Sequence, residues 1–543
     1  MSASAAELRQ FPEGIWAATG TSAAPLEDQL RRLLAWTGRF HSAPRDFGLA
    51  VRHCLETLPG GRMVLAGAGT HSRRLIPELS RRPDIRIVAV ADRLAGAMAE
   101  FEGIPVVAAS AAAALDADYV LVAHTSYELE MRAALLAAGF PADRIVTLYS
   151  DPRYRERAVP VARRLAEAAV LRSADFVVVN CCPAAIVPDE LLAGAFPPDR
   201  TVELFVGRAD GFEPSPVYET VDLLESMDAL RLALLSLRPK AIYIRTILYK
   251  NFIPALVKHW LPDARVIAEP YDFAVLWSEG DLELLFGLSP ETIALTRSAE
   301  FVAGRTVDLI LSKRGGDHWD RVVRPWTAGS VLYFPAVADA GDADGRRGDL
   351  VYAGFLPAEA FLKTFQSGYS FVPVMREVCA RGDLRGEIYN SADTGPAGPS
   401  IFRSYRESMA QGPLRYHGRL PYPEMLERLR GFRYGWLCDA LGNFQGDRYV
   451  GVCNRWTGYV SAGLPLLIDA HWSFMVDLVD RFGAGIVVDR IDPDGIAEAV
   501  RRADWRAQAA GTRALRRHLL DWNRNSFDKL AGVADAALTQ RGD

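Results

Sequence analysis

The sequence predicts an α/β fold built from parallel, doubly wound sheets, and residues 454–468 illustrate the pattern. Roughly nine residues of helical character lead through a Gly-Leu-Pro turn into the apolar run Leu-Leu-Ile, which has the length of a buried strand. Gly463 stands where a helix ends in a left-handed residue, and Pro465 prevents the helix from continuing. A second helix–turn–strand unit ends in a strand at 485–488. Alternating helices and strands favour parallel pairing.

The same alternation occurs near the N-terminus. Residues 62–66 form a predicted buried strand that leads into Gly67-Ala-Gly69, and a second predicted strand ends just before Asp92. The glycines let the backbone approach a diphosphate at a helix N-terminus, and the acid can accept ribose hydroxyls. We therefore expect Gly67, Gly69 and Asp92 to bind a nucleotide or dinucleotide. Because Ser72 replaces the third glycine of the pattern, a module used only for assembly is an open alternative.

Composition excludes several classes of protein. The 543 residues carry a net charge of −5, which does not suit a nucleic-acid partner. The six cysteines have no framework spacing, as expected for reduced cytoplasmic thiols. No signal peptide and no apolar run of membrane-spanning length is expected. These observations predict a cytoplasmic protein and leave room for peripheral contact with the inner membrane.

Changes of pattern divide the chain into five parts. A helical lead-in (1–55) precedes a Rossmann-like domain (56–150), a helical connector (151–172), a second α/β domain (173–340) and a third α/β domain (341–543). Asp342-Ala-Asp344, in the linker before the third domain, has the spacing of a metal-binding pair. Such pairs occur often by chance in polar linkers, so we expect no metal site.

The 454–468 stretch also resembles a known family. It is similar to the segment N-K-x-x-E-Y-x-A-x-G-x-P-V-I in the donor domain of group 1-like GT-B-fold glycosyltransferases. Asn454, Tyr459, Gly463 and Pro465 match this pattern, and Arg455 replaces its Lys. The resemblance implies three Rossmann-like domains, of which the last two form a GT-B-type pair with a cleft between them. It also implies that the last helix crosses back onto the first domain of that pair.

The resemblance further implies a donor site at one edge of the third domain. The segment 414–425 is similar to the family's strand, glycine turn and helix, and a predicted strand at 350–354 ends in a glycine. Helix N-termini and arginines suit a diphosphate, although a solvated face is an open alternative for the arginines. The expected donor-binding residues are Gly354, His417, Gly418, Arg419, Asn454, Arg455 and Tyr459.

The second domain resembles the acceptor-side domain of the same family. Glu269 and Asp272 follow a predicted strand, where the family has an acid-bearing loop, and either is a candidate general base. Capping a turn or pairing with an arginine is the open alternative for both. A helix containing Glu300 then leads to a strand that begins near Asp308, which also fits the family.

These expectations describe a metal-independent glycosyltransferase of bacterial surface-polysaccharide or glycoconjugate biosynthesis. It would move a sugar from a nucleotide-sugar donor to a glycan or protein acceptor, with no cofactor required for transfer. Gly458 stands where the family has a ribose-binding Glu, and Phe355-Leu356-Pro357 replaces an Arg and a Lys. Both departures favour an alternative, a catalytically degenerate binding or scaffold protein. A third hypothesis makes the first domain a dinucleotide-dependent oxidoreductase. The sequence does not encode the sugar, the acceptor, the stereochemistry or the oligomeric state.

Overall fold

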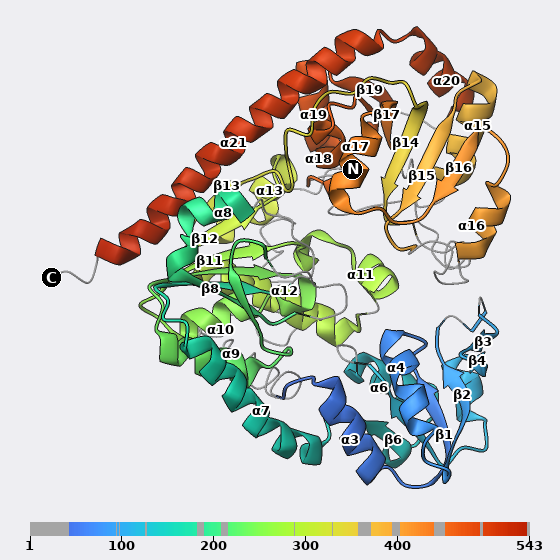
Figure 1. Ribbon diagram of the computed structural model, residues 1–543, viewed down its shortest axis with the longest axis vertical. Helices are drawn as coiled ribbons and strands as arrows, with labels where there is room; N and C mark the ends of the chain where they lie inside the picture. Colours follow the sequence, from blue (N-terminus) through green and yellow to red (C-terminus); the bar gives the residue numbers. More distant parts are fainter. Residues whose placement is uncertain are drawn as a thin grey trace.

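The computed structural model describes residues 43–93, 95–96, 98–124, 128–181, 189–207, 215–286, 288–327, 329–356, 371–393, 402–438, 451–488 and 492–539. Over these ranges the chain forms three sheets that are almost entirely parallel, each flanked by helices (Figure 1). The predicted α/β class with doubly wound, Rossmann-like sheets is confirmed. The predicted helical lead-in lies outside the described residues as far as residue 42.

The first sheet has the strand order β3-β4-β2-β1-β5-β6. Its strands are β1 (Gly61–Ala66), β2 (Ile85–Ala91), β3 (Glu100–Phe101), β4 (Ile104–Val107), β5 (Tyr119–Val122) and β6 (Ile145–Thr147). Only the β3–β4 pair is antiparallel among the described strands. The helices are α3 (Phe47–Thr57), α4 (Thr70–Leu79), α5 (Ala109–Ala113) and α6 (Glu128–Ala137). The connector predicted at 151–172 is helix α7 (Pro152–Val170), which Asp151 caps at its N-terminus.

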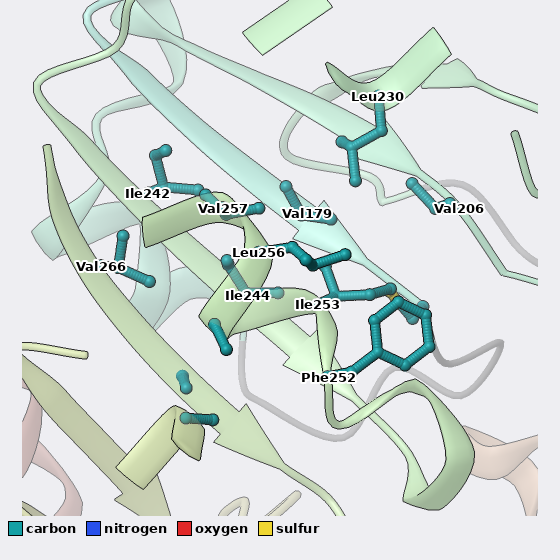
Figure 2. Close-up of a cluster of buried hydrophobic side chains, with 14 of the residues drawn as sticks. Val179, Val206, Leu230, Ile242, Ile244, Phe252, Ile253, Leu256, Val257 and Val266 are labelled. Carbon is teal, nitrogen blue, oxygen red and sulfur yellow. The ribbon is translucent and has the colours of Figure 1, made fainter. Parts of the chain in front are cut away.

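The second sheet has the order β13-β12-β11-β10-β7-β8-β9. Its strands are β7 (Phe176–Asn180), β8 (Thr201–Phe205), β9 (Glu219–Asp222), β10 (Ala241–Thr246), β11 (Arg265–Pro270), β12 (Leu309–Ser312) and β13 (Ser330–Leu332). Its helices are α8 (Asp189–Ala195), α9 (Met227–Leu237), α10 (Ile253–Trp260), α11 (Glu279–Phe286), α12 (Pro290–Thr306) and α13 (Asp317–Val322). One face of the central strands packs against α9 and α10 in an apolar core (Figure 2). These strands are buried on both faces, which explains their continuous apolar runs.

The third sheet has the order β16-β15-β14-β17-β18-β19. Its strands are β14 (Gly348–Gly354), β15 (Gly386–Asn390), β16 (Leu414–His417), β17 (Phe432–Leu437), β18 (Leu466–Asp469) and β19 (Gly485–Val488). Its helices are α15 (Phe371–Gly382), α16 (Arg403–Ser408), α17 (Tyr422–Leu429), α18 (Asn454–Ser461), α19 (Ser473–Phe482) and α20 (Pro493–Arg502). As predicted, Gly463 has a left-handed backbone, with φ of 65°, in the turn between α18 and β18.

A single long helix, α21 (Trp505–Thr539), runs from the third sheet back to the second (Figure 1). Near its start Leu515 and Leu519 belong to the core of the third sheet. Further along, Phe527 and Leu530 complete the core on one face of the second sheet. The Asn523 side chain donates to the Phe334 carbonyl and accepts from the Phe334 N–H, both at 2.8 Å. Among the described helices, none combines the length and the apolarity that crossing a membrane would require.

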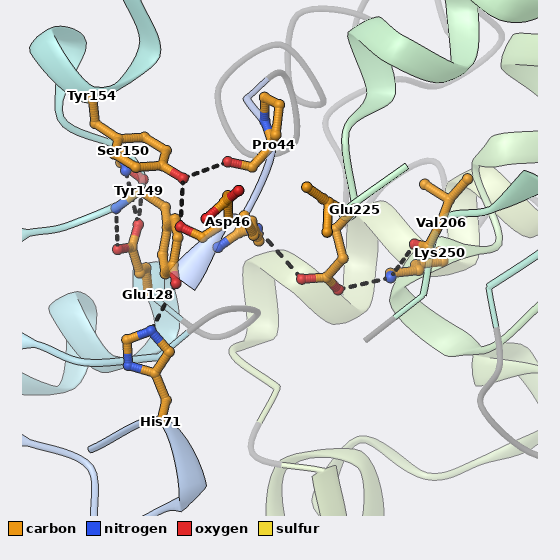
Figure 3. A network of polar contacts seen from close by, with 12 residues as sticks. Pro44, Asp46, His71, Glu128, Tyr149, Ser150, Tyr154, Val206, Glu225 and Lys250 are labelled. Atoms are coloured by element: carbon orange, nitrogen blue, oxygen red, sulfur yellow. Dashed lines mark hydrogen bonds and ion pairs between the residues drawn. The ribbon is translucent and has the colours of Figure 1, made fainter. Parts of the chain in front are cut away.

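A buried polar network joins the first domain to the second (Figure 3). The Arg45 N–H donates to the Leu224 carbonyl at 2.7 Å, and its guanidinium lies 3.6 Å from Glu225. Glu225 also pairs with Lys250 at 3.0 Å, and Lys250 donates to the Val206 carbonyl at 2.8 Å. Leu224 and Glu225 have left-handed backbones, with φ of 50° and 59°. Such conformations are costly for residues other than glycine, so these contacts must hold the turn in place.

Replacing Glu225 by Gln should destabilise the fold, because Arg45 and Lys250 would remain buried without their shared carboxylate. Breaking a buried pair from one side costs about 3–5 kcal/mol. The measurement is urea denaturation followed by tryptophan fluorescence. The matched control is Glu219→Gln, which removes an exposed ion pair with Arg172 and should cost about 0–1 kcal/mol. Equal losses in the two variants would contradict a stabilising role for the junction.

Candidate functional site

The third sheet reverses its strand order at β14, which has β15 on one side and β17 on the other. Ligands in open parallel sheets bind at such reversals, outside the carboxyl ends of the strands. Gly354 ends β14, His417 ends β16, and α18 begins at Asn454 after β17. Asn390, at the end of β15, supports this edge: its side chain accepts from the Leu356 N–H at 3.0 Å and donates to the Leu356 carbonyl at 2.9 Å.

Arg455 lies across the end of β14. A Cβ atom added to Gly354 would lie 2.4 Å from Cδ of Arg455, so the glycine makes room for this side chain. The guanidinium carbon is 4.6 Å from the centre of the Tyr352 ring, within the range of a cation–π contact. Among the described residues, the buried Oδ1 atom of Asn454 has no hydrogen-bond partner. The first N–H groups of an α-helix have no partner within the helix, so the N-terminus of α18, with the positive side chain of Arg455 beside it, suits an anion.

Asp393 stabilises the turn after β16. The Asp393 carbonyl accepts from the Arg419 N–H at 2.6 Å, while its buried carboxylate pairs with Arg406 at 2.7 Å. The Arg419 side chain is exposed. Gly418 separates it from His417, whose Nε2 lies 3.0 Å from Oε2 of Glu387 on β15. His417 is therefore engaged with the sheet, whereas Arg419 is accessible at the edge.

The Glu387 carboxylate, next to this edge, contacts two positive or titratable side chains, Arg347 and His417, and the hydroxyl of Tyr389. Burial raises its pKa, but hydrogen bonds from His417, Tyr389 and Arg347 outweigh that effect and lower the pKa to about 2. The Tyr389 and His417 rings stack with their centres 4.7 Å apart. The carboxylate, 3.0 Å from Nε2, and the stacked Tyr389 ring thus keep the imidazole of His417 against the sheet. His417 supports the turn at Gly418, and its Nε2 atom is directed towards Glu387.

Tyr459 lies in the core of the third domain, away from the edge of the sheet. Its ring packs on β17, where a Cβ added to Gly435 would come within 2.4 Å of it. Its hydroxyl accepts from the Ala353 N–H at 3.0 Å and donates to the Val351 carbonyl at 3.3 Å. Because it is fully buried, Tyr459 fixes α18 against β14 and does not offer its side chain to a ligand. Its predicted contribution to the donor site is therefore indirect.

The segment just before α18 contacts the second domain. Arg314 forms an isolated antiparallel bridge with Gly451, and the Val452 N–H donates to the Lys313 carbonyl at 3.1 Å. A Cβ on Gly451 would collide with the Arg314 guanidinium. Lys313 and Arg314 follow β12 directly, so this junction lies at the carboxyl edge of the second sheet. The sequence analysis missed both basic residues, although an adjacent Lys-Arg pair at a strand end was a usable signal.

Asp272 belongs to the same junction. Its Oδ1 atom accepts from Arg314 at 2.5 Å and lies 3.7 Å from Lys313 Nζ. The side chain is 14% exposed, and Oδ2 has no hydrogen bond to any described residue. Arg314 therefore joins Asp272 to Gly451, three residues before Asn454. The structure brings Asp272 and the N-terminus of α18 into one region.

Glu269 is placed very differently from Asp272. It is 1% exposed and pairs with Arg245 at 2.7 Å, and the hydroxyls of Tyr243 and Tyr333 donate to its two oxygens. Side chains alternate along a strand, so Glu269 shares its face of β11 with Ile267, under α21. Both carboxylate oxygens are thus bonded inside the domain, and neither is directed at the strand edge. This geometry indicates that Glu269 stabilises the domain interior, and it does not favour Glu269 as a base.

The first sheet has the predicted turn. The Ala68 N–H donates to Oδ2 of Asp92 at 2.7 Å, which confirms that Asp92 lies beside the turn between Gly67 and Gly69. Gly67 has a φ of 104°, and Gly69 precedes the first residue of α4. The hydroxyl of Ser72, which replaces the third glycine, donates to the Gly67 carbonyl. The Ser72 side chain therefore stabilises the turn through a hydrogen bond to the backbone of the turn itself.

No group of three or more His, Cys, Asp or Glu residues that could hold a metal ion occurs in the part of the chain that the structure describes. In the linker, Asp342 accepts from Arg516 of α21 at 2.9 Å. Asp344 lies 3.8 Å from Arg346. Asp342 thus attaches the linker to α21, whereas the ion pair of Asp344 lies within the linker.

No protein-family model and no curated protein matches the sequence. Solved structures that are similar include a UDP-glucosyltransferase from Polygonum tinctorium, with 12% identity and a TM-score of 0.41 over 66% of this chain and 98% of that one. Trehalose 6-phosphate synthase from Burkholderia multivorans has 12% identity and a TM-score of 0.43, over 68% of this chain and 100% of that one. The catalytic domain of starch synthase IV from Arabidopsis thaliana has 10% identity and a TM-score of 0.39, over 66% of this chain and 99% of that one. At these values the likeness establishes neither a family nor an activity for this chain.

Gly354→Ala should weaken the binding of a nucleoside diphosphate, because the new Cβ would displace Arg455 from the end of β14. Losing one charge-assisted hydrogen bond costs about 1.5–3 kcal/mol, or roughly a tenfold or larger rise in Kd. Calorimetry with uridine, guanosine and cytidine diphosphates measures this change. Gly532→Ala, at an exposed position of α21 with open space around it, is the control. Unchanged binding in Gly354→Ala would show that Arg455 does not contact the ligand.

Proposed function

We propose that this chain is a metal-independent glycosyltransferase of the GT-B type, acting on a nucleotide-sugar donor and a glycan or protein acceptor. One observation carries the proposal: Arg314 joins Asp272 of the second domain to Gly451, next to the N-terminus of α18. An anion-binding helix end on one domain thereby adjoins a carboxylate on the other. Transfer of a sugar from a diphosphate to a hydroxyl needs both parts.

The donor diphosphate would bind at the first turn of α18. Arg455 and the positive end of the α18 dipole would supply positive charge, and Arg419 at the neighbouring turn adds a second guanidinium. Gly354 and Gly418 let the backbone approach the ligand. His417 and Tyr459 act through these turns, since Glu387 and the core engage their polar atoms. In this arrangement Arg455, Arg419 and the N-terminus of α18 would stabilise the negative charge that develops on the leaving diphosphate.

Asp272 is the base in this proposal. Its Oδ1 atom is fixed by Arg314, which leaves Oδ2 to accept a proton from the acceptor hydroxyl. The acceptor oxygen forms a bond to the anomeric carbon as the bond between that carbon and the diphosphate oxygen breaks. The nucleoside diphosphate leaves with the electron pair. Glu269 has no part in this step, because its two oxygens are already bonded to Arg245, Tyr243 and Tyr333.

The alternative of a degenerate binding or scaffold protein has one specific observation in its favour. Gly458 stands on α18 where the resemblance places a ribose-binding Glu, and a Cβ added there would meet no described atom within 4 Å apart from its chain neighbours and the backbone of its own helix. Position 458 itself thus offers no carboxylate. Calorimetry with uridine, guanosine and cytidine diphosphates separates the two functions. Binding of one of them supports the transferase, and binding of none leaves the scaffold protein.

The wider setting is also part of the proposal. We place the reaction in bacterial surface-polysaccharide or glycoconjugate biosynthesis, in the cytoplasm or in peripheral contact with the inner membrane. The turn between Gly67 and Gly69, with Asp92 beside it, would hold a nucleotide or dinucleotide in the first domain. The domain roles follow the predicted division, with the acceptor side at 173–340 and the donor side at 341–543.

Asp272→Asn keeps the size of the side chain and removes its charge. Turnover should fall by about two to four orders of magnitude, the usual contribution of a general base, while the KM for the donor changes little. Release of the nucleoside diphosphate from a panel of nucleotide sugars measures both constants. Asp263→Asn, at an exposed position before β11, is the control and should be neutral.

Glu269→Gln provides the contrast. It should lower stability, because Arg245 loses its buried partner, and leave the turnover of the folded protein unchanged. Near-normal turnover in Asp272→Asn, with the melting temperature preserved, would remove Asp272 as the base. A different residue as the base, or a retaining mechanism without one, would then have to be tested.

A further inference from the structure

The loop that carries Asp272 leaves β11 and turns sharply through the short 3-10 helix Ala274–Leu276. Its backbone is largely buried, so its N–H and C=O groups need partners inside the protein. Some of these partners are other backbone groups of the loop and of β10. Two side chains from distant parts of the chain, Glu300 and Asn251, bond to three further groups: the Ala274 N–H, the Val275 N–H and the Asp272 carbonyl.

Glu300 projects from α12 into the inner side of this loop. It is 2% exposed. Its Oε1 atom accepts from the Ala274 N–H at 2.6 Å, and its Oε2 atom accepts from the Val275 N–H at 3.0 Å. Two successive backbone amides are thus bound by one carboxylate. Burial raises the pKa of Glu300 to about 7, a rise that these amides, Asn251 and Arg297 oppose.

Asn251 connects Glu300 to the residue that carries the proposed base. Its Nδ2 atom donates to Oε1 of Glu300 at 2.6 Å and to the carbonyl of Asp272 at 2.8 Å. Its Oδ1 atom accepts from the Thr246 hydroxyl at 2.7 Å, at the end of β10. Both Asn251 and Thr246 are almost fully buried. Every polar atom of the Asn251 side chain is therefore used to fix the loop against β10 and α12.

A second residue of α12 extends the same contact. Arg297 lies one turn before Glu300, and its guanidinium donates to the carbonyls of Ala274 at 3.3 Å and Trp277 at 2.8 Å. Among the described side chains of α12, the Glu300 carboxylate binds N–H groups of the loop and the Arg297 guanidinium binds its carbonyls. The helix holds the loop through backbone groups, so the contact does not depend on the loop's own side chains.

We propose that Glu300 and Asn251 are positioning residues that set the location of the Asp272 carboxylate relative to the N-terminus of α18. This inference rests on the proposed function, since it gives a purpose to the fixed position of Asp272. Arg314 holds Asp272 through its side chain, whereas Glu300 and Asn251 hold it through the backbone. A base displaced by about 1 Å loses roughly 100-fold in rate, so this precision matters to the reaction.

The first measurement is hydrogen exchange of peptides covering residues 272–277, which does not depend on activity. Glu300→Ala should raise exchange there by about tenfold or more, because the Ala274 and Val275 amides lose their acceptor. Glu300→Gln should rescue part of the protection, since its carbonyl can still bind Ala274 and Asn251. Glu203→Ala is the control. Glu203 is buried in the same domain, on β8, and bonds to Asn180 and Thr220.

The second measurement is release of UDP from UDP-glucose and UDP-N-acetylglucosamine, with the folded fraction checked by melting. Glu300→Ala and Asn251→Ala should lower kcat by about 100-fold with little change in the KM for the donor. When combined with Asp272→Asn, neither should add its full effect, because all three act through one carboxylate. Glu203→Ala should lower stability and leave the kcat of the folded protein unchanged.

The outcomes separate the two proposals. If Asp272→Asn lowers turnover and Glu300→Ala does not, the positioning role is wrong and the assignment of the base survives. If exchange at 272–277 stays slow in Glu300→Ala, the positioning role is also wrong. If Asp272→Asn leaves turnover unchanged, the assignment of the base fails, and the exchange measurement alone decides whether Glu300 holds the loop.

Discussion

Between two parallel strands of a sheet, the chain must cross back to the edge at which the first strand began. This requirement determines the layout of all three sheets. It places the turns that follow the strands at one edge of each sheet and the turns that precede them at the other. Residues as distant in sequence as Gly354, Gly418 and Asn454 therefore lie at one edge of the third sheet. The same rule puts Asp92 beside Gly67 in the first. The candidate site is a consequence of this topology.

Where local pattern and topology decided the outcome, the sequence was sufficient. Gly463 marked the end of α18 because few residues other than glycine accept a left-handed backbone. Asp92 could be placed because the second strand of a βαβ unit runs beside the first. The order of helices and strands in the second and third domains followed from apolar runs and glycine turns. These features depend on a few neighbouring residues, which is why one sequence can reveal them.

Where side-chain direction decided the outcome, the sequence was insufficient. Glu269 and Asp272 are three residues apart, yet one faces the interior under α21 and the other the junction with Gly451. The alternation along β11 was readable, but which face α21 would cover was not. Tyr459 matched a family pattern and lies in the core, where its hydroxyl bonds to backbone groups. Arg314 was overlooked because its partners come from two distant segments.

The long helix α21 has a consequence for how the chain reaches its folded state. Phe527 and Leu530 complete a core whose strands end with β13 at Leu332, so the second domain depends on residues made 195 positions later. At about 5–20 residues per second, translation takes roughly 10–40 s to cover that distance. During this interval the part of that face which α21 covers remains exposed beside α8, and the third domain is synthesised next to it. Folding of the second domain on the ribosome is thereby tied to the completion of the third, and the nascent chain exposes apolar surface for as long as that takes.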